Sequence, residues 1–194
     1  MKKSIFLAAL IGGIIAFVWS MLSWTVFPWY KSQFKQFKDS EQVSDLVREQ
    51  VTEGGVYMLP GCCGDCATKE AEAEWKKNYE RGPIMFASIS PKGEKFSMVQ
   101  NIIVQFVMLF IASLLIGYIL SEFKSNSAYG ERVFAVTVIG LIIAILTAIP
   151  YWNWWHFPAG YTIISFCDAI VMWFLAGLGI AKFAHPAPAP KKKK

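Results

Sequence analysis

The chain has 194 residues, of which 55% are hydrophobic and 17% charged, and its formal net charge is +5. A composition this apolar excludes an ordinary soluble domain and indicates a membrane protein. The basic excess does not call for nucleic acid as a partner, because membrane topology accounts for it. The sequence shows no nucleotide-binding loop, catalytic triad, pair of carboxylates or haem motif, so we do not expect an enzyme.

Four apolar stretches are long enough, or nearly so, to cross the hydrocarbon core as helices, which takes about 20 residues. The first follows two lysines, as the core of a signal peptide does, but its apolar run is too long and no small-residue cleavage site follows it. We therefore expect an uncleaved anchor and a bundle of four transmembrane helices, an all-α membrane protein. The predicted helices are residues 4–27, 98–120, 133–150 and 161–183.

The positions of lysine and arginine predict how these helices are oriented. With the N-terminus inside, nine basic residues fall in cytoplasmic segments, whereas the short loop 151–160 has none. The long segment 28–97 holds the other ten, but long loops cross a membrane largely regardless of charge. Tryptophans then collect at the outer surface, as an aromatic belt does. The compact basic start and short loops suggest a bacterial inner membrane, with both termini cytoplasmic.

Residues 28–97 are expected to form a small α+β extracytoplasmic cap between the first two transmembrane helices. Asp39-x-x-Gln42 resembles a capping box, which marks a helix start. The following elements alternate between helical spacing and strand composition, with glycine or proline between them. The predicted order is a helix begun by Asp39 and ended by Gly54, a strand Val56–Leu59, a helix capped by Thr68 and ended by Gly82, and a strand Ile84–Ile89.

Two further segments have a marked composition. The outer loop 151–160 carries Trp152, Trp154, Trp155 and His156. It is expected either to anchor the bundle in the headgroup layer or to bind a quinone, a lipid or a neighbouring subunit. The tail 184–194 alternates proline with alanine and ends in four lysines, so we expect it to be disordered and attracted to anionic lipid.

Asp168 is the most informative single residue, because it lies inside the fourth predicted helix. A carboxylate in a membrane costs a few kcal/mol and is a functional-site hypothesis by default. Asp168, Gln105 and Ser20 each lie seven residues from the outer end of a predicted helix, roughly 10 Å deep. They form a predicted intramembrane polar site that either binds or conducts a cation, proton or ligand, or holds helices together with Gln105, Ser20 or Ser165 as hydrogen-bond partners.

Cys62, Cys63 and Cys66 lie together in the predicted cap. The Cys63-x-x-Cys66 spacing occurs in thiol oxidoreductases and in metal half-sites. A metal ion here would need a further ligand, for which Asp65 and His156 are candidates. A structural disulfide that closes the loop is the alternative, since the outer side of a membrane is oxidising.

Small residues recur at every fourth position of the predicted helices, a pattern that lets helix backbones approach closely. We expect these stripes to pack helices within the chain, or to leave one face for a partner. They are Gly12, Ala16 and Ser20; Ser113 and Gly117; Gly140, Ala144 and Ala148; and Gly177 and Ala181.

Three functions follow from these patterns. The first is a small accessory or assembly subunit of a membrane complex, with protein partners in the bilayer. The second is a thiol/disulfide or metal-handling membrane protein that uses Cys62, Cys63 and Cys66. The third is a small transporter that uses Asp168 and requires a homo-oligomer, since four helices enclose little pathway alone.

Overall fold

The structure, a computed structural model, describes residues 3–61, 68–123 and 126–184. They divide into two compact units. The helical unit comprises Met1–Phe34, Ser97–Trp152 and Phe157–Lys194, and the α+β unit comprises Lys35–Phe96 and Asn153–His156.

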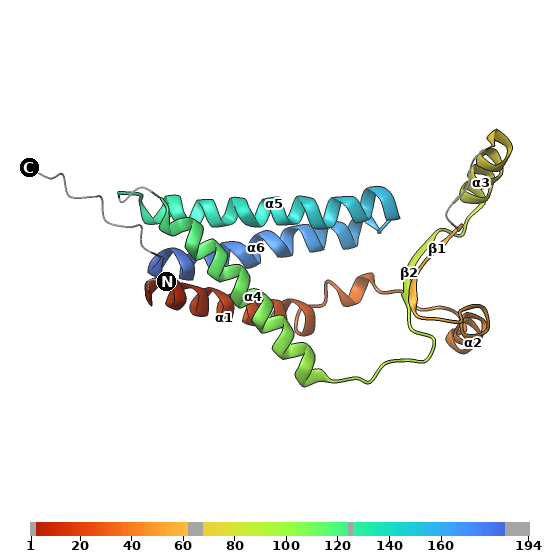
Figure 1. Ribbon diagram of the computed structural model, residues 1–194, viewed down its shortest axis with the longest axis horizontal. Helices are drawn as coiled ribbons and strands as arrows, with labels where there is room; N and C mark the ends of the chain where they lie inside the picture. The colour runs from red at the N-terminus through yellow and green to blue at the C-terminus, as the bar shows by residue number, and fades with distance from the viewer. Residues whose placement is uncertain (1–2, 62–67, 124–125, 185–194) are drawn as a thin grey trace, which may run out of the picture. The chain divides into compact units, whose positions relative to one another are not determined.

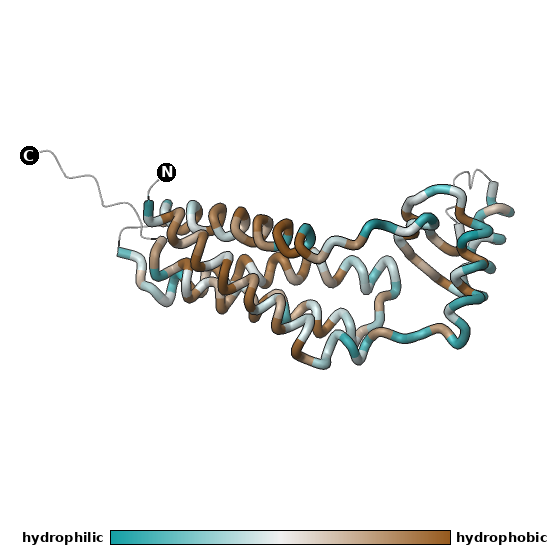
Figure 2. The backbone as a smooth tube through the Cα atoms, turned by 90° about the horizontal axis from the view of Figure 1, so that it is seen from below, coloured by the Kyte–Doolittle hydropathy of each residue, from teal (hydrophilic) through white to brown (hydrophobic). Residues whose placement is uncertain are grey.

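In the described residues the helical unit contains four long helices, and a short 3₁₀ helix, η1, follows the first of them. All four are long and apolar enough to cross a membrane, and hydrophobic residues predominate along their length (Figure 2). The predicted, mostly helical class is therefore confirmed, and the four apolar helices support a multi-pass membrane protein. The elements are α1 Lys3–Thr25, η1 Lys31–Gln33, α4 Met98–Ser121, α5 Tyr129–Trp155 and α6 Ala159–Phe183.

Helix α1 packs against both α4 and α6, and α5 runs alongside α6 (Figure 1). Helix α4 crosses α1 obliquely, and its N-terminal part extends beyond it (Figure 1). Residues from all four helices meet in one buried cluster, which includes Ala16, Leu109, Val136, Trp173 and Ile180. The cluster fixes the relative rotation of the helices that surround it.

The predicted small-residue stripes form contacts inside the helical unit. Gly140 lies so close to α6 that a Cβ atom there would be 2.6 Å from the Cβ of Trp173. A Cβ at Gly177 would likewise lie 3.0 Å from the Cβ of Val136 on α5. Ala144 and Ala148, on the same stripe as Gly140, are buried too. Small side chains therefore allow α5 and α6 to pack at short range.

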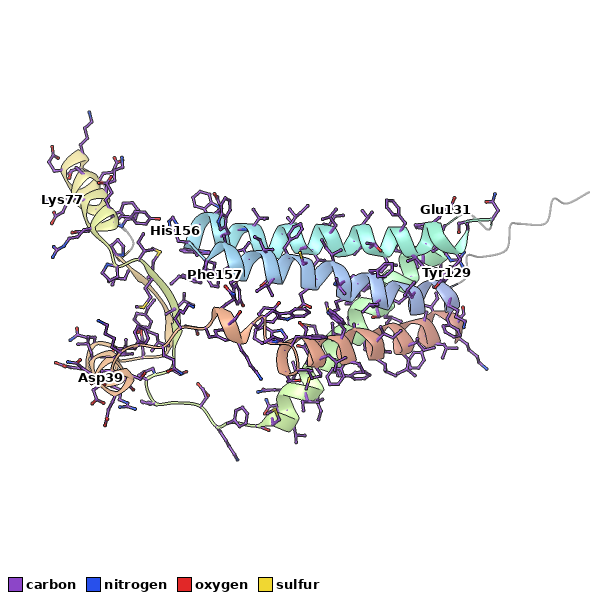
Figure 3. The ribbon with its side chains drawn as sticks, turned by 180° about the vertical axis from the view of Figure 1, so that it is seen from behind. Asp39, Lys77, Tyr129, Glu131, His156 and Phe157 are labelled. Carbon is purple, nitrogen blue, oxygen red and sulfur yellow. The ribbon has the colours of Figure 1, made fainter. Side chains whose placement is uncertain are left out.

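Helix α5 is longer than the sequence predicts. Pro150 does not end it, and residues 151–155 continue the helix to Trp155. Proline removes one backbone donor but is tolerated within membrane helices. The connection to α6 is thus only His156, Phe157 and Pro158, and His156 turns the chain with φ of 54°. Figure 3 labels Tyr129 and Glu131 at the start of α5, and His156 and Phe157 at this corner.

The other end of the α5–α6 pair is joined by hydrogen bonds from α5 to carbonyls in the last turns of α6. The buried guanidinium of Arg132 donates to the carbonyl of Ala181 from Nε at 3.2 Å and from Nη2 at 3.0 Å. Its Nη1 donates to the carbonyl of Ser127 at 2.6 Å. The Tyr129 hydroxyl donates to the Leu178 carbonyl at 2.9 Å. A cation at a helix C-terminus also interacts favourably with the helix dipole.

The α+β unit contains the elements that the sequence predicts. The Asp39 side chain accepts from the Gln42 backbone N–H at 2.9 Å, and Thr68 accepts from that of Ala71 at 3.2 Å. Gly82 ends the second helix with φ of 67°, a conformation that glycine adopts readily. The two strands pair antiparallel, with Tyr57 opposite Ala87. The elements are α2 Ser40–Gln50, β1 Gly55–Leu59, α3 Lys69–Arg81 and β2 Met85–Ile89.

Candidate functional site

Asp168 accepts three side-chain hydrogen bonds from the first helix and the segment that follows it. Trp19 Nε1 and Ser23 Oγ each donate to Oδ1 at 2.8 Å. The Tyr30 hydroxyl donates to Oδ2 at 3.0 Å. Asp168 lies nine residues after the start of α6 at Ala159, about 14 Å along the helix. The carboxylate therefore joins α1 to α6 well inside a candidate membrane span.

The local sequence explains why these donors converge. Trp19 and Ser23 are four residues apart, so they lie on the same side of α1. After Thr25 the chain turns back on itself, which brings Trp29 and Tyr30 against the end of α1. Trp29 Nε1 donates to Ser23 Oγ at 3.2 Å, and the Tyr30 ring stacks on Trp24 at 4.2 Å between centroids. The aromatic turn thus holds two of the three donor groups in place.

The surroundings of Tyr30 raise the pKa of its phenol. Burial raises the pKa of its phenol well above the ordinary value, and the neighbouring charge of Asp168 raises it further. A hydrogen bond with Ser165 acts in the opposite direction and lowers it. Tyr30 therefore stays protonated and acts as a hydrogen-bond donor to the carboxylate at neutral pH.

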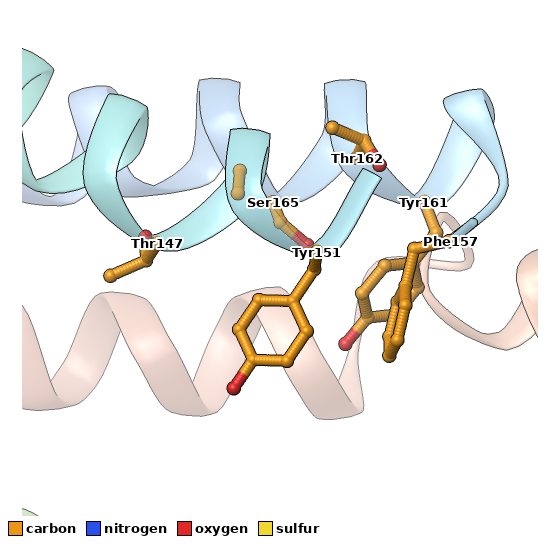
Figure 4. A pocket seen from close by; sticks show the side chains of 7 residues that line it. Thr147, Tyr151, Phe157, Tyr161, Thr162 and Ser165 are labelled. Carbon is orange, nitrogen blue, oxygen red and sulfur yellow. The ribbon is translucent and has the colours of Figure 1, made fainter. Parts of the chain in front are cut away.

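Two cavities lie on different faces of α6 near this network. The first has a volume of about 380 Å³ and is lined by hydroxyl and aromatic side chains of α5, α6 and their corner (Figure 4). The second has a volume of about 310 Å³ and is almost entirely apolar, with Asp168 as its one ionisable carboxyl group. The lining residues of the first are Thr147, Ala148, Tyr151, Phe157, Tyr161, Thr162 and Ser165; those of the second are Trp19, Trp29, Ile163, Ile164, Cys167, Asp168 and Val171.

The other two residues of the predicted polar site are not hydrogen-bonded to Asp168 in the described part of the chain. Ser20 Oγ donates to the carbonyl of Phe17 in its own helix at 2.8 Å. Gln105 is half-buried on α4. The sequence predicts a similar depth for all three residues but not their direction around the helix axis. Ser20 is one residue from Trp19, which rotates it by about 100° away from the carboxylate.

Trp19, Ser23 and Tyr30 are the partners that sequence reasoning missed. The spacing of Trp19 and Ser23 was visible as an i, i+4 pair of hydrogen-bond donors on one helix. Nothing in the sequence marked Tyr30, because the turn after α1 brings it back onto α6.

The aromatic segment 151–160 is divided between α5, the corner and α6. Within the α+β unit, the Trp155 ring stacks on Phe86 of β2 at 4.2 Å between centroids. The Tyr79 hydroxyl of α3 is hydrogen-bonded to His156 Nε2. Trp154 also lines a small cavity of this unit, whereas Trp152 is half-exposed in the helical unit. Trp155 and His156 therefore make contacts with the strand and helix of the α+β unit.

The cysteine cluster Cys62, Cys63 and Cys66 lies outside the described residues, as does Asp65. The cluster therefore stays a prediction, both as a disulfide and as a metal site. Among the residues that the structure describes, no group of three or more histidine, cysteine, aspartate or glutamate side chains could hold a metal ion.

Comparison with known proteins gives no family to which the chain can be assigned. No protein-family profile, curated protein or solved structure matches it.

Proposed function

We propose that the protein is a small accessory or assembly subunit of a membrane complex, which docks onto a partner helix through α4. The observation that carries the proposal is an amide pair on this helix. Asn101 and Gln105 are four residues apart and so lie on one face. Neither side chain forms a hydrogen bond within the described residues of the chain, and Asn101 is exposed.

An amide without a hydrogen-bond partner is most costly at Gln105. It lies seven residues after Met98, the start of α4, or roughly 10 Å along the helix. A polar group in hydrocarbon without a hydrogen bond costs several kcal/mol. Glutamine and asparagine side chains in membranes commonly find partners on a neighbouring helix. The partner that fits is a transmembrane helix with a polar side chain at the same depth.

The shape of the helical unit supports the same face. Residues 101–104 form a run of exposed positions on α4, and this part of the helix extends beyond α1 (Figure 1). The same face continues through Met108 and Leu115, which are both more than half exposed. By contrast, the donors to Asp168 come from the chain itself. Docking is therefore assigned to α4 and not to the carboxylate.

The orientation belongs to the proposal as well. The basic residues Lys3, Arg132 and Lys182 lie at one end of the four helices, near the start of α1 and α5 and the end of α6. By the positive-inside rule this end is cytoplasmic. Both termini then lie on the cytoplasmic side of a bacterial inner membrane, and the α+β unit lies on its outer side. A reporter fused to the C-terminus would be inaccessible to protease added outside intact spheroplasts. Digestion of that reporter in sealed spheroplasts would contradict the orientation.

The docking proposal is tested by native mass spectrometry of the protein, extracted gently from its own membranes. We expect a heavy assembly with defined partner chains for the wild type. Gln105→Leu should release the partner, because it removes the amide and keeps the helix apolar. Gln100→Leu is the matched control, since Gln100 lies in the first turn of α4, where water can hydrate an amide.

Two outcomes would overturn the proposal. The first is a wild-type protein that is monomeric or a homo-oligomer after gentle extraction. The second is an assembly that Gln105→Leu leaves as intact as Gln100→Leu does. A homo-oligomer would redirect attention to the predicted transporter function, which requires one.

A further inference from the structure

We propose that the apolar cavity beside Asp168 binds a small hydrophobic organic cation, such as a quaternary ammonium ion. The inference is independent of docking through α4, because the cavity lies between α6 and the end of α1 with its following turn. It rests on three features of the cavity: its charge, its aromatic wall and its access.

The charge follows from the hydrogen-bond pattern. The Trp19 indole N–H can only donate, so Asp168 Oδ1 accepts from it. Ser23 receives a hydrogen bond from Trp29 and directs its own proton to the same oxygen. With Tyr30 donating to Oδ2, every described partner of the carboxyl group donates to it, a pattern that suits an ionised carboxylate.

This negative charge has no counter-ion in the described part of the chain. The ion pairs there are Asp45 with Arg48 and Glu72 with Lys76, both in the α+β unit. The basic residues of the four long helices, Lys3, Arg132 and Lys182, lie near the opposite ends of those helices. An intramembrane carboxylate is normally paired, so a cation from outside the chain is the complement.

The lining of the cavity selects an organic cation over a metal ion. Trp19 and Trp29 line the wall next to the carboxylate, and indole rings attract cations through their faces. The remaining lining is aliphatic apart from Cys167. A sodium or calcium ion needs several oxygen ligands, which this wall does not supply. The volume of about 310 Å³ lies at the small end of ligand cavities.

The cavity is reached from the side of α6 that faces away from the helix core. Ile163, Cys167 and Val171 recur at every fourth residue of α6 and all three are exposed. Ile163 has 62% of its surface exposed. A hydrophobic cation dissolved in the bilayer can therefore enter sideways and reach the carboxylate without crossing the helix core.

The test is equilibrium dialysis of the full chain in detergent micelles with benzyltrimethylammonium as the probe. Neopentylbenzene, which has the same shape without the charge, is the matched ligand. We expect one benzyltrimethylammonium ion to bind per chain. Asp168→Asn should weaken this binding at least 10-fold and leave the retention of neopentylbenzene unchanged.

A second pair of variants keeps the test valid if Asp168→Asn does not fold. Cys167→Phe fills the cavity from its exposed side and leaves the carboxylate intact, so it should abolish binding. Leu146→Phe makes a similar change at an exposed position of α5 outside the cavity and should leave binding unchanged. Monodisperse elution on size exclusion verifies folding for each variant.

Three outcomes would overturn the proposal. One is that Cys167→Phe, or a folded Asp168→Asn, binds benzyltrimethylammonium as well as the wild type does. Another is equal dependence of the charged and neutral ligands on Asp168, which would leave only an apolar groove. The third is a cross-link between Cys167 and a lysine or arginine of a co-purifying chain. A side chain of the partner would then occupy the cavity in place of a small cation.

Discussion

The hydroxyl of Ser23 on α1 donates a 2.8 Å hydrogen bond to Asp168 on α6, 145 residues later in the chain. The same hydroxyl accepts a hydrogen bond from the Trp29 indole at 3.2 Å. One buried serine thus connects the first helix, the aromatic turn and the last helix. The contribution of this network to stability can be measured by removing that single oxygen.

Ser23→Ala should lower the stability of the folded protein by about 1 kcal/mol, the usual scale for a hydrogen bond between membrane helices. For a chain of this size that corresponds to a fall in Tm of about 2–4 °C, measured by thermal unfolding in a mild detergent. Ser20→Ala is the matched control, because the Ser20 hydroxyl bonds only to its own helix. Equal effects of the two substitutions would contradict a cross-helix role for Ser23.

Gly140→Ala should destabilise the protein by about 1–3 kcal/mol through overpacking. Its new Cβ would lie 2.6 Å from the Cβ of the buried Trp173, which cannot move without shifting α6. Gly117→Ala places its Cβ 3.5 Å from Ile5 Cγ2, an ordinary contact, and should be close to neutral. Urea titration of both variants in the same detergent distinguishes them. Equal tolerance of the two alanines would mean that α5 and α6 are not in close contact at Gly140.

Arg132→Lys should destabilise the end of the α5–α6 pair although it keeps the positive charge. The guanidinium holds the Ala181 and Ser127 carbonyls together from three nitrogen atoms, a geometry that a lysine ammonium cannot reproduce. We expect a loss of about 1–2 kcal/mol, measured by thermal unfolding. Lys182→Arg, at an exposed position near the end of α6, should change nothing. If Arg132→Lys were as stable as the wild type, charge alone would explain this residue.

The stability of the protein should fall as the pH rises past the ordinary tyrosine value of about 10. Because the pKa of Tyr30 is raised in the folded state, the unfolded chain loses this proton first. The stabilisation is therefore complete below that pH and is lost as the pH rises toward the folded-state pKa. The difference in stability between the wild type and Tyr30→Phe should shrink between about pH 9 and 12. A difference that stays constant over this range would contradict the burial of the phenol.

Much of the fold could be predicted from the sequence, because hydropathy and capping are local signals. Four long apolar runs predict membrane helices whatever their neighbours, and the caps at Asp39 and Thr68 depend on residues within one turn. The end of α5 could not be predicted in this way. A proline usually limits a helix in water, yet α5 continues past Pro150 to Trp155. Trp155 and His156 contact other residues of the α+β unit.

The candidate site shows where the sequence was sufficient and where tertiary structure decided. The sequence by itself determined that Asp168 is a carboxylate within an apolar helix, and it predicts that Gln105 and Ser20 lie at a similar depth. Only the tertiary structure decided its partners, Trp19, Ser23 and Tyr30. Depth follows from counting residues along a helix. Direction depends on how each helix is rotated in the bundle and on how the turn after α1 folds back, and these are set by packing between distant segments.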